Sequence, residues 1–408
     1  EQKFECDIPG AGFVQSCYEI LSQKVENENQ HRLLYDIEMP LAEVLAAMEY
    51  RGFAVDRQGI EEFGEKLREM IDKTREEIYV LVGEKFNLNS PKQLAHALFE
   101  VMGLPSGKKT KTGYSTNAET LENLRQYSPV IDMILNYRTY QKLNSTYVEG
   151  LIDKIKPDGR IHSTFNQTEA RTGRISSSEP NLQNIPVRTK LGSEMRKFFV
   201  AKPGYVLLDA DYSQIELRIL AHISGDKVMQ TAFLNGEDIH TRTAAQVMGI
   251  PTSMVTPQIR SRAKAVNFGI VYGISAFSLA KDIGTTVREA QDFIDNYFKN
   301  FSGVKDYLDN SVKFAQENGY VTTIYNRKRM LPEINSSNKN VRSVGKRMAM
   351  NTPIQGTSAD IIKIAMVKVY NRLKAEGLKS KLILQVHDEL IVEAPADEAE
   401  RAAKILHE

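Results

Sequence analysis

Cysteine is scarce in this sequence: its 408 residues contain only Cys6 and Cys17, which lie near the start without a CxxC spacing. Disulfide frameworks and zinc sites need several cysteines at characteristic spacings. We therefore expect a reduced, cytosolic chain that has neither structural disulfides nor a structural zinc site.

Long hydrophobic runs are missing as well. The first residues, EQKFECDIPG, carry charges and a proline where a signal peptide would have an apolar run. The longest uncharged stretch, residues 265–280, contains Gly, Ser, Asn and Tyr and is shorter than the roughly 20 apolar residues of a membrane-spanning helix. The sequence therefore predicts a soluble protein with no membrane association.

Neither sign of charge is in excess, because 53 Lys and Arg residues are balanced by 52 Asp and Glu residues, for a net charge of +1. The total charge therefore neither indicates nor excludes a polyanionic partner. The phosphate-binding pattern GxxxxGK[ST] is also absent, which disfavours a P-loop ATPase. Apolar residues make up 41% of the chain, enough for the cores of about two or three domains.

The pattern of the chain changes along its length. Up to about residue 155 the apolar spacing is mainly helical, and a Pro-Asp-Gly turn then leads into short strands and loops. The later segments predict helices over 225–320, a hairpin over 320–334, a helix over 340–376 and a hairpin over 381–394. This order predicts an α+β protein: a helical arm, then a mixed body interrupted by a second helical region.

Two pairs of carboxylates follow apolar strands. Asp209 and Asp211 are two residues apart in LLDADYSQIE, which puts both on one face of a strand. Asp388 and Glu389 stand between the two apolar runs of the last hairpin. Solvated side chains at strand ends are the simple alternative for each pair taken alone. Together they predict a Mg²⁺ site, because oxygen ligands suit this ion and a metal pair can activate an attacking oxygen and stabilise a leaving one.

A stripe of cations and aromatics lies in residues 259–274. A helix there would align Arg260, Lys264, Phe268 and Tyr272 at successive i+4 positions. The cations suit phosphates, and the aromatics suit a base or sugar. The alternative is an amphipathic helix with buried aromatics and solvated cations, but the stretch contains no acidic residue to pair with those cations.

Two further segments, 171–190 and 338–360, are rich in basic residues. The first contains Arg174 and Arg188, and the second repeats Arg347, Asn351 and Gln355 at i+4 spacing. Such side chains suit minor-groove and phosphate contacts, although a polar helix face beside water is the alternative for each segment. Together these segments indicate a track for a polyanion that the small net charge conceals.

Four motifs in these segments resemble those of a known family. DYSQIELR (211–218), RSRAKAVNFGIVYG (260–273) and QVHDEL (385–390) resemble motifs A, B and C of the family A DNA polymerases. TGRISSSEPNLQNIP (172–186) resembles a further signature of the bacterial DNA polymerase I group. The resemblance runs in order from about residue 37 to the end, and it implies the polymerase (large) fragment of such an enzyme.

The resemblance implies a right-hand polymerase fold with a helical thumb, an antiparallel-sheet palm and helical fingers. The expected bounds are 1–36 for a remnant of an upstream exonuclease-like module, 37–160 for the thumb, 161–222 and 346–408 for the palm, and 223–345 for the fingers. We expect this chain to lack a proofreading or 5′-nuclease module. We also expect it to end earlier than the family usually does.

The implied activity is template-directed addition of deoxynucleotides to a primer 3′-hydroxyl, with two Mg²⁺ ions, for which Mn²⁺ can substitute, and release of pyrophosphate. The implied partners are primer-template DNA and dNTPs, for a monomeric enzyme of DNA replication and repair in the bacterial cytoplasm, associated with the nucleoid. The alternatives are a single-subunit RNA polymerase-like enzyme and a non-catalytic nucleic-acid clamp.

The resemblance also assigns roles to individual residues. The expected catalytic residues are Asp211, Asp388, Glu389 and Lys264, and the expected metal ligands are Asp211, Asp388 and the carbonyl of Tyr212. The expected nucleotide contacts are Tyr212, Gln214, Glu216, His240, Arg260, Lys264, Phe268 and Tyr272. The expected DNA contacts are Arg174, Arg188, Arg347, Asn351, Gln355 and His387. Asp209 lies outside the motif and carries no expected role.

Overall fold

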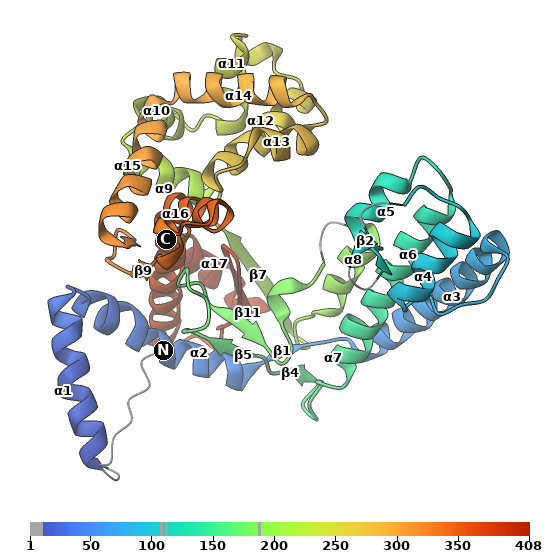
Figure 1. Cartoon of the computed structure of the whole chain (residues 1–408). Coiled ribbons are helices and arrows are strands. Elements are labelled where there is room, and N and C mark those ends of the chain that lie inside the picture. The colour runs from blue at the N-terminus through green and yellow to red at the C-terminus, as the bar shows by residue number, and fades with distance from the viewer. Residues whose placement is uncertain (1–10, 107–108, 111–112, 187–188) are drawn as a thin grey trace. The chain divides into compact units, whose positions relative to one another are not determined.

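The computed structural model describes residues 11–408 except 107–108, 111–112 and 187–188 (Figure 1). The chain forms two compact units. The smaller unit comprises Glu49–Thr164 and Ser177–Leu207, and the larger unit comprises the chain up to Met48 together with Phe165–Ser176 and Leu208–Glu408.

The smaller unit is a set of helices around one apolar core. Its regular elements are β1 (Phe53–Ala54), α3 (Arg57–Val82), α4 (Pro91–His96), β2 (Lys109–Thr110), β3 (Gly113–Tyr114), α5 (Ala118–Leu124), α6 (Val130–Lys142), α7 (Gly150–Ile152), β4 (Arg160–Ile161) and α8 (Lys190–Glu194). The long α3 begins after Asp56, whose side chain accepts from the Gly59 N–H, and ends at Gly83, whose φ of 88° suits glycine. Its buried Ile71 and Ile78 belong to a core that Leu121 and Ile134 complete from α5 and α6.

The larger unit combines helices with small sheets. Its helices are α1 (Ala11–Asn27), α2 (Met39–Arg51), α9 (Ile215–Ser224), α10 (Lys227–Leu234), α11 (Ile239–Met248), α12 (Pro257–Val271), α13 (Ala276–Ile283), α14 (Val287–Asn300), α15 (Ser302–Asn318), α16 (Lys339–Ala375) and α17 (Ala399–His407). Its strands are β8 (Tyr320–Thr322), β9 (Lys328–Met330), β10 (Lys381–Val386), β11 (Glu389–Pro395) and most of β7 (Tyr205–Asp211). The chain passes between the two units within β5 (Thr164–Asn166) and β6 (Ser176–Ser178), which pair with each other. The predicted hairpins and the predicted helix over 340–376 are confirmed, and the α+β class with them.

The three-stranded sheet has the order β10-β11-β7. The last hairpin is antiparallel and pairs Val386 with Glu389, so that its turn consists of only His387 and Asp388. Helices α16 and α17 pack against the two strands of this hairpin, and most residues of both strands are buried. The apolar runs on both sides of the turn therefore anchor it in the core of the unit.

Helix α16 makes unusually close backbone contacts through two glycines. A Cβ atom on Gly345 would lie 2.7 Å from the backbone nitrogen of Ile334. A Cβ atom on Gly356 would lie 2.6 Å from the Thr323 methyl carbon and 3.1 Å from the carbonyl oxygen of Thr172. The absence of a side chain at these positions lets the helix touch the segment around the β8–β9 hairpin and the segment that leads to Arg174.

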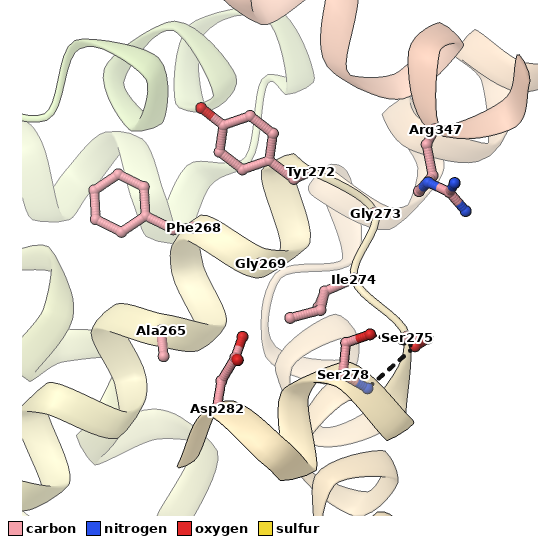
Figure 2. A pocket seen from close by; sticks show the side chains of 10 residues that line it. All are labelled: Ala265, Phe268, Gly269, Tyr272, Gly273, Ile274, Ser275, Ser278, Asp282 and Arg347. Atoms are coloured by element: carbon pink, nitrogen blue, oxygen red, sulfur yellow. Dashed lines mark hydrogen bonds between the residues drawn. The ribbon is translucent and has the colours of Figure 1, made fainter. Parts of the chain in front are cut away.

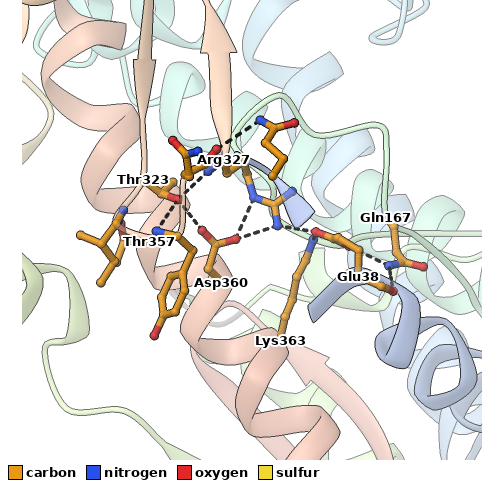
Figure 3. Close-up of polar contacts among 11 residues, drawn as sticks. Glu38, Gln167, Thr323, Arg327, Thr357, Asp360 and Lys363 are labelled. Atoms are coloured by element: carbon orange, nitrogen blue, oxygen red, sulfur yellow. Dashed lines mark hydrogen bonds and ion pairs between the residues drawn. The ribbon is translucent and has the colours of Figure 1, made fainter. Parts of the chain in front are cut away.

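A buried charge network joins three distant segments of the larger unit (Figure 3). Lys363 Nζ lies 2.7 Å from Glu38 Oε1, and Arg327 Nε donates to Asp360 Oδ1 at 2.7 Å. Arg327 also pairs with Glu38, and the Thr323 hydroxyl donates to Asp360 Oδ2 at 2.7 Å. Asp360 is fully buried and Lys363 is only 1% exposed. The two acids and two bases balance each other.

The pKa shifts in this network reflect burial and pairing. Burial alone would raise the pKa of Glu38, but Lys363 and Arg327 beside it bring that pKa below its ordinary value. Burial lowers the pKa of Lys363, although the neighbouring carboxylates oppose this change. Removing one member would leave an uncompensated charge inside the protein, which is more costly than the pair itself is favourable.

We predict that Lys363→Met lowers the free energy of unfolding by about 3–5 kcal/mol, because it leaves Glu38 and Asp360 with a single cationic partner in a buried site. The control is Lys368→Met, which makes the same change at an exposed position of the same helix. Urea denaturation of both variants checks the prediction. Equal stabilities of the two variants would contradict it.

Candidate active site

The carboxylates of the early strand and of the late turn lie next to each other. Asp211 is the last residue of β7, and the backbone N–H of Tyr212 donates to the carbonyl oxygen of Asp388 at 3.2 Å. Burial raises the pKa of Asp211, and the charges of Asp388 and then Asp209 raise it further. The sheet thus holds like charges together at the ends of its strands.

The backbone around these carboxylates is strained. His387 in the hairpin turn and Gln214 before α9 both have φ of 51°, the left-handed region that residues other than glycine rarely adopt. The Gln385 side chain donates to the carbonyl oxygen of His387 at 2.5 Å. Such strain persists where the surrounding structure enforces it, and it concentrates at functional sites.

Glu216, in the first turn of α9, is a buried carboxylate with two partners. Its side chain belongs to a residue only 8% exposed, and burial raises its pKa above the ordinary value. Arg174 Nη2 donates to Oε1 at 2.8 Å, and the Tyr272 hydroxyl donates to Oε2 at 3.1 Å. With its amide oxygen facing Arg174, Gln355 accepts from both terminal guanidinium nitrogens at 3.2 and 3.1 Å. Arg174 therefore joins Glu216 to α16.

The loop that carries Arg174 is held by close packing. A Cβ atom on Gly173, whose φ is 82°, would lie 2.5 Å from Arg327 Cδ. The neighbouring Thr172 carbonyl lies against Gly356 of α16. The buried charge network and the glycine of α16 thus fix the segment from which Arg174 reaches Glu216.

Helix α12 carries the predicted stripe. The Thr256 side chain caps it by accepting from the Ile259 N–H. The Lys264 ammonium lies 5.9 Å from the centroid of the Phe268 ring, on the predicted i+4 line. Tyr272 follows directly at the end of the helix.

Arg260, at the other end of the stripe, already has a partner. Its Nε and Nη2 donate to Asp238 Oδ1 and Oδ2 at 3.0 and 2.6 Å. Asp238 also caps α11 by accepting from the Thr241 N–H at 2.7 Å. The hydrogen bond from Arg260 holds the pKa of Asp238 far below its ordinary range. Sequence reasoning missed this pair, because it found no acid within the α12 segment itself.

A pocket of about 580 Å³ opens beside the aromatic end of the stripe (Figure 2). Among the residues that line it are Phe268 from α12, Tyr272 directly after that helix, Ser278 and Asp282 from α13, and Arg347 from α16. Gly273 makes the tight connection to Ile274 with φ of 64°, and a Cβ atom there would lie 2.6 Å from the Met350 methyl group. Its lining combines aromatic side chains with a guanidinium and a carboxylate group, a combination that suits a planar, partly polar ligand.

Comparison with known proteins shows which family this chain belongs to. The sequence model of DNA polymerase family A matches residues 57–408. The chain belongs to DNA polymerase family A. It is 54% identical to DNA polymerase I of Caldicellulosiruptor bescii over 380 residues, which are 93% of this chain and 45% of that protein. It is 50% identical to DNA polymerase I of Geobacillus stearothermophilus over 392 residues, which are 96% of this chain and 45% of that protein.

A solved structure is also similar. The POL domain of Pol1 from M. smegmatis, in complex with a DNA primer-template and dNTP, has a TM-score of 0.89 and 43% sequence identity to this chain. The match covers 95% of this chain and 68% of that one. The fold is therefore that of a family A polymerase domain, and the chain spans less than half the length of the curated relatives described above.

The other expected site residues of this family A chain lie as follows. Arg347 is exposed, Asn351 donates to the carbonyl oxygen of Val271 at 3.4 Å, and both lie on α16 with Gln355. His387 is exposed in the turn. Glu389 is the first residue of β11. Arg188 lies outside the described residues.

We predict that Asp211→Asn raises the thermal unfolding midpoint of the metal-free protein at neutral pH by about 1–2 °C. The raised pKa of Asp211 means that its ionised form costs folding free energy above that pKa, and the substitution removes this cost. Mg²⁺ should stabilise the wild type more than the variant. Differential scanning calorimetry with and without Mg²⁺ measures this, and a lower midpoint for the metal-free variant would refute it.

Proposed function

We propose that this chain is a template-directed DNA polymerase, which adds deoxynucleotides to a primer 3′-hydroxyl and releases pyrophosphate. The observation that carries this proposal is the adjacency of Asp211 and Asp388 in a member of family A. The similar M. smegmatis domain is described with a DNA primer-template and dNTP, which supports the same partners here.

The donor set fits divalent metal ions. Asp211 and Asp388 supply carboxylates and Tyr212 supplies a backbone carbonyl, all oxygen donors of the kind that Mg²⁺ prefers. Within the part of the chain that the structure describes, no group of three or more His, Cys, Asp or Glu side chains is arranged to hold a metal. A site with two carboxylates suits Mg²⁺, which usually keeps waters and substrate phosphates as further ligands.

We propose two such ions. When bound, they would make the primer hydroxyl more acidic and offset the charge that develops on the leaving pyrophosphate. The protein's own contribution is to hold Asp211 and Asp388 at fixed positions on the sheet, so that little reorganisation is needed during the reaction. Glu389, next to Asp388, would be a supporting carboxylate at the same end of the sheet.

The triphosphate would lie along the cationic half of α12. Lys264 and Arg260 offer charge for the phosphates, and His240 lies near Phe268, with ring centroids 5.8 Å apart. Phe268 would face the sugar and Tyr272 the templating position beside the pocket. Gln214 would contact the nucleotide from the N-cap of α9. Such contacts act mainly by positioning the reacting groups.

Glu216 is proposed to favour deoxynucleotides. Its buried carboxylate is fixed by Arg174 and Tyr272, and it would lie under the sugar of the nucleotide, where it leaves no room for a 2′-hydroxyl. This distinguishes the proposal from an RNA polymerase-like activity. Comparing dNTP and rNTP incorporation separates the two.

The primer terminus and the minor groove would lie along Arg347, Asn351 and Gln355 of α16, with Arg174 and His387 as further contacts. Arg188, which lies outside the described residues, is also proposed to contact DNA. Amide and guanidinium groups can bond to minor-groove acceptors without distinguishing most sequences. The thumb (37–160), palm (161–222 and 346–408) and fingers (223–345) remain predictions, as does a monomeric state. No helix among the described residues is both long and apolar enough to span a bilayer.

We predict that Asp388→Ala reduces primer extension by on the order of a thousandfold or more, because it removes one of the two carboxylates of the metal site. Binding of primer-template DNA should change little. Asp397→Ala, an equal charge change at an exposed position, serves as the control. Extension assays with Mg²⁺ and each dNTP, beside fluorescence anisotropy for DNA binding, test this. Near-normal extension by Asp388→Ala would sink the proposal.

We also predict that Asp238→Asn lowers the KM for dNTP by about two- to fivefold, because Arg260 then no longer has to exchange an ionised partner for the phosphates. This range corresponds to an exposed ion pair of about 0.5–1 kcal/mol. Asparagine keeps the acceptor that caps α11. Steady-state kinetics of single-nucleotide incorporation provide the measurement. A higher KM would instead mean that Asp238 holds Arg260 in its productive position.

A further inference from the structure

Three buried polar side chains form a hydrogen-bonded chain between α11 and α12. The Thr243 hydroxyl donates to Asn267 Oδ1 at 3.1 Å, and Asn267 Nδ2 lies 3.0 Å from His240 Nδ1. Thr243 and Asn267 are fully buried, and His240 is only 2% exposed. The site assignments above give no role to Thr243 or Asn267.

The chemistry of these groups links their orientation to the proton on His240. An amide has one acceptor oxygen and one donor nitrogen, so a hydroxyl that donates to the oxygen leaves the nitrogen to donate to the ring. A neutral imidazole that accepts at Nδ1 carries its proton on Nε2. Burial lowers the pKa of His240, and the cations Arg260 and Lys264 lower it further against the opposing effect of Asp238. This lowered pKa favours the neutral ring.

We propose that Asn267, oriented by Thr243, is a positioning residue that keeps His240 in the Nε2–H tautomer, so that the ring donates a hydrogen bond to the phosphates of the incoming nucleotide. This inference rests on the proposed function, in which His240 contacts the triphosphate. Phosphate oxygens only accept hydrogen bonds, so the opposite tautomer would turn a bare nitrogen lone pair toward them.

The same hydrogen bond connects the histidine to the cationic stripe. Asn267 lies on α12 with Arg260 and Lys264, whereas His240 lies on α11. Asn267 therefore fixes the ring relative to the helix that supplies the other two phosphate-binding groups. Outer partners that fix the tautomer of a histidine ligand have this effect at metal sites, and the argument transfers to an anion.

The opposite polarity is the specific alternative. Turning the Asn267 amide over would let His240 Nδ1–H donate to its oxygen and would let the amide nitrogen donate to Thr243. The heavy atoms would occupy the same places. The two arrangements differ in the orientation of the Asn267 amide and in the tautomer of His240, and the tautomer is measurable.

The first test is ¹⁵N NMR of the whole chain labelled at histidine, without nucleotide. The chain has 7 histidines, and loss of a signal in His240→Asn assigns the relevant one. We expect a protonated Nε2 and a bare Nδ1. A protonated Nδ1 would overturn the proposal whether or not the chain is a polymerase.

The second test uses Asn267→Asp, which keeps the shape and can only accept from the ring. A carboxylate there also raises the pKa of His240, so the variant is assayed at a pH above that raised pKa, where the neutral ring carries its proton on Nδ1. We expect kcat/KM for dNTP to fall roughly tenfold or more, the effect of losing a hydrogen bond to a charged group. We expect the same variant to have no further effect in a His240→Ala background. Losses that add in full would mean that Asn267 has only a structural role, and would overturn the proposal.

Thr243 provides a matched pair of variants for the same test. Thr243→Val removes the hydroxyl at nearly constant volume, and Thr243→Ser retains it. We expect Thr243→Val to increase the population of the Nδ1–H tautomer and to lower kcat/KM for dNTP. We expect Thr243→Ser to keep the Nε2–H tautomer and the kcat/KM of the wild type. Equal behaviour of the two variants would contradict the role of the hydroxyl.

Failure of the proposed function gives a different result. It would appear as no primer extension by the wild type, while the NMR measurement would still decide the tautomer. An active His240→Ala enzyme with unchanged kcat/KM for dNTP would overturn the triphosphate contact and this inference, but not the polymerase activity.

Discussion

Two like-charged carboxylates, Asp211 and Asp388, lie close together at one end of the β10-β11-β7 sheet. Their mutual repulsion destabilises the fold that holds them. The apolar strands on either side of the turn supply the opposing free energy, since most of their residues are buried. A two-residue turn with a left-handed His387 leaves the Asp388 carboxylate little freedom. The stability of the hairpin thereby maintains an arrangement that like-charge repulsion disfavours, and the proposed metal ions would relieve that repulsion.

Helix α16 connects this end of the sheet to the rest of the larger unit. That helix packs on β10, contributes Asp360 and Lys363 to the buried charge network, and presents Gln355 to Arg174. Arg174 in turn holds Glu216 in the first turn of α9, just after the strand that ends in Asp211. One long helix thus connects the charge network, the pocket and the end of the sheet, which explains why close glycine contacts occur along it.

The sequence predicted those helices and strands whose signals lie within one short segment. Two apolar runs around a short polar segment predicted the last hairpin, and i+4 spacing predicted that Lys264 and Phe268 share one face of a helix. The sequence did not predict contacts between segments that are far apart in the chain. Nothing near Glu38 indicates that it pairs with Lys363, because the partner is set by how helices pack and not by any local period. For the same reason Arg260 was expected to be available for phosphates, whereas Asp238 at the start of another helix holds it.

We propose that Asp211 and Asp388 share divalent cations when DNA and a nucleotide are bound. Crystals grown with primer-template, a non-hydrolysable dNTP and Mn²⁺ would locate the ions by anomalous scattering. We expect anomalous peaks that mark ions coordinated by both aspartate carboxylates and by the phosphates of the nucleotide. Metal bound elsewhere, with the two aspartates sharing no ion in a fully assembled complex, would contradict it.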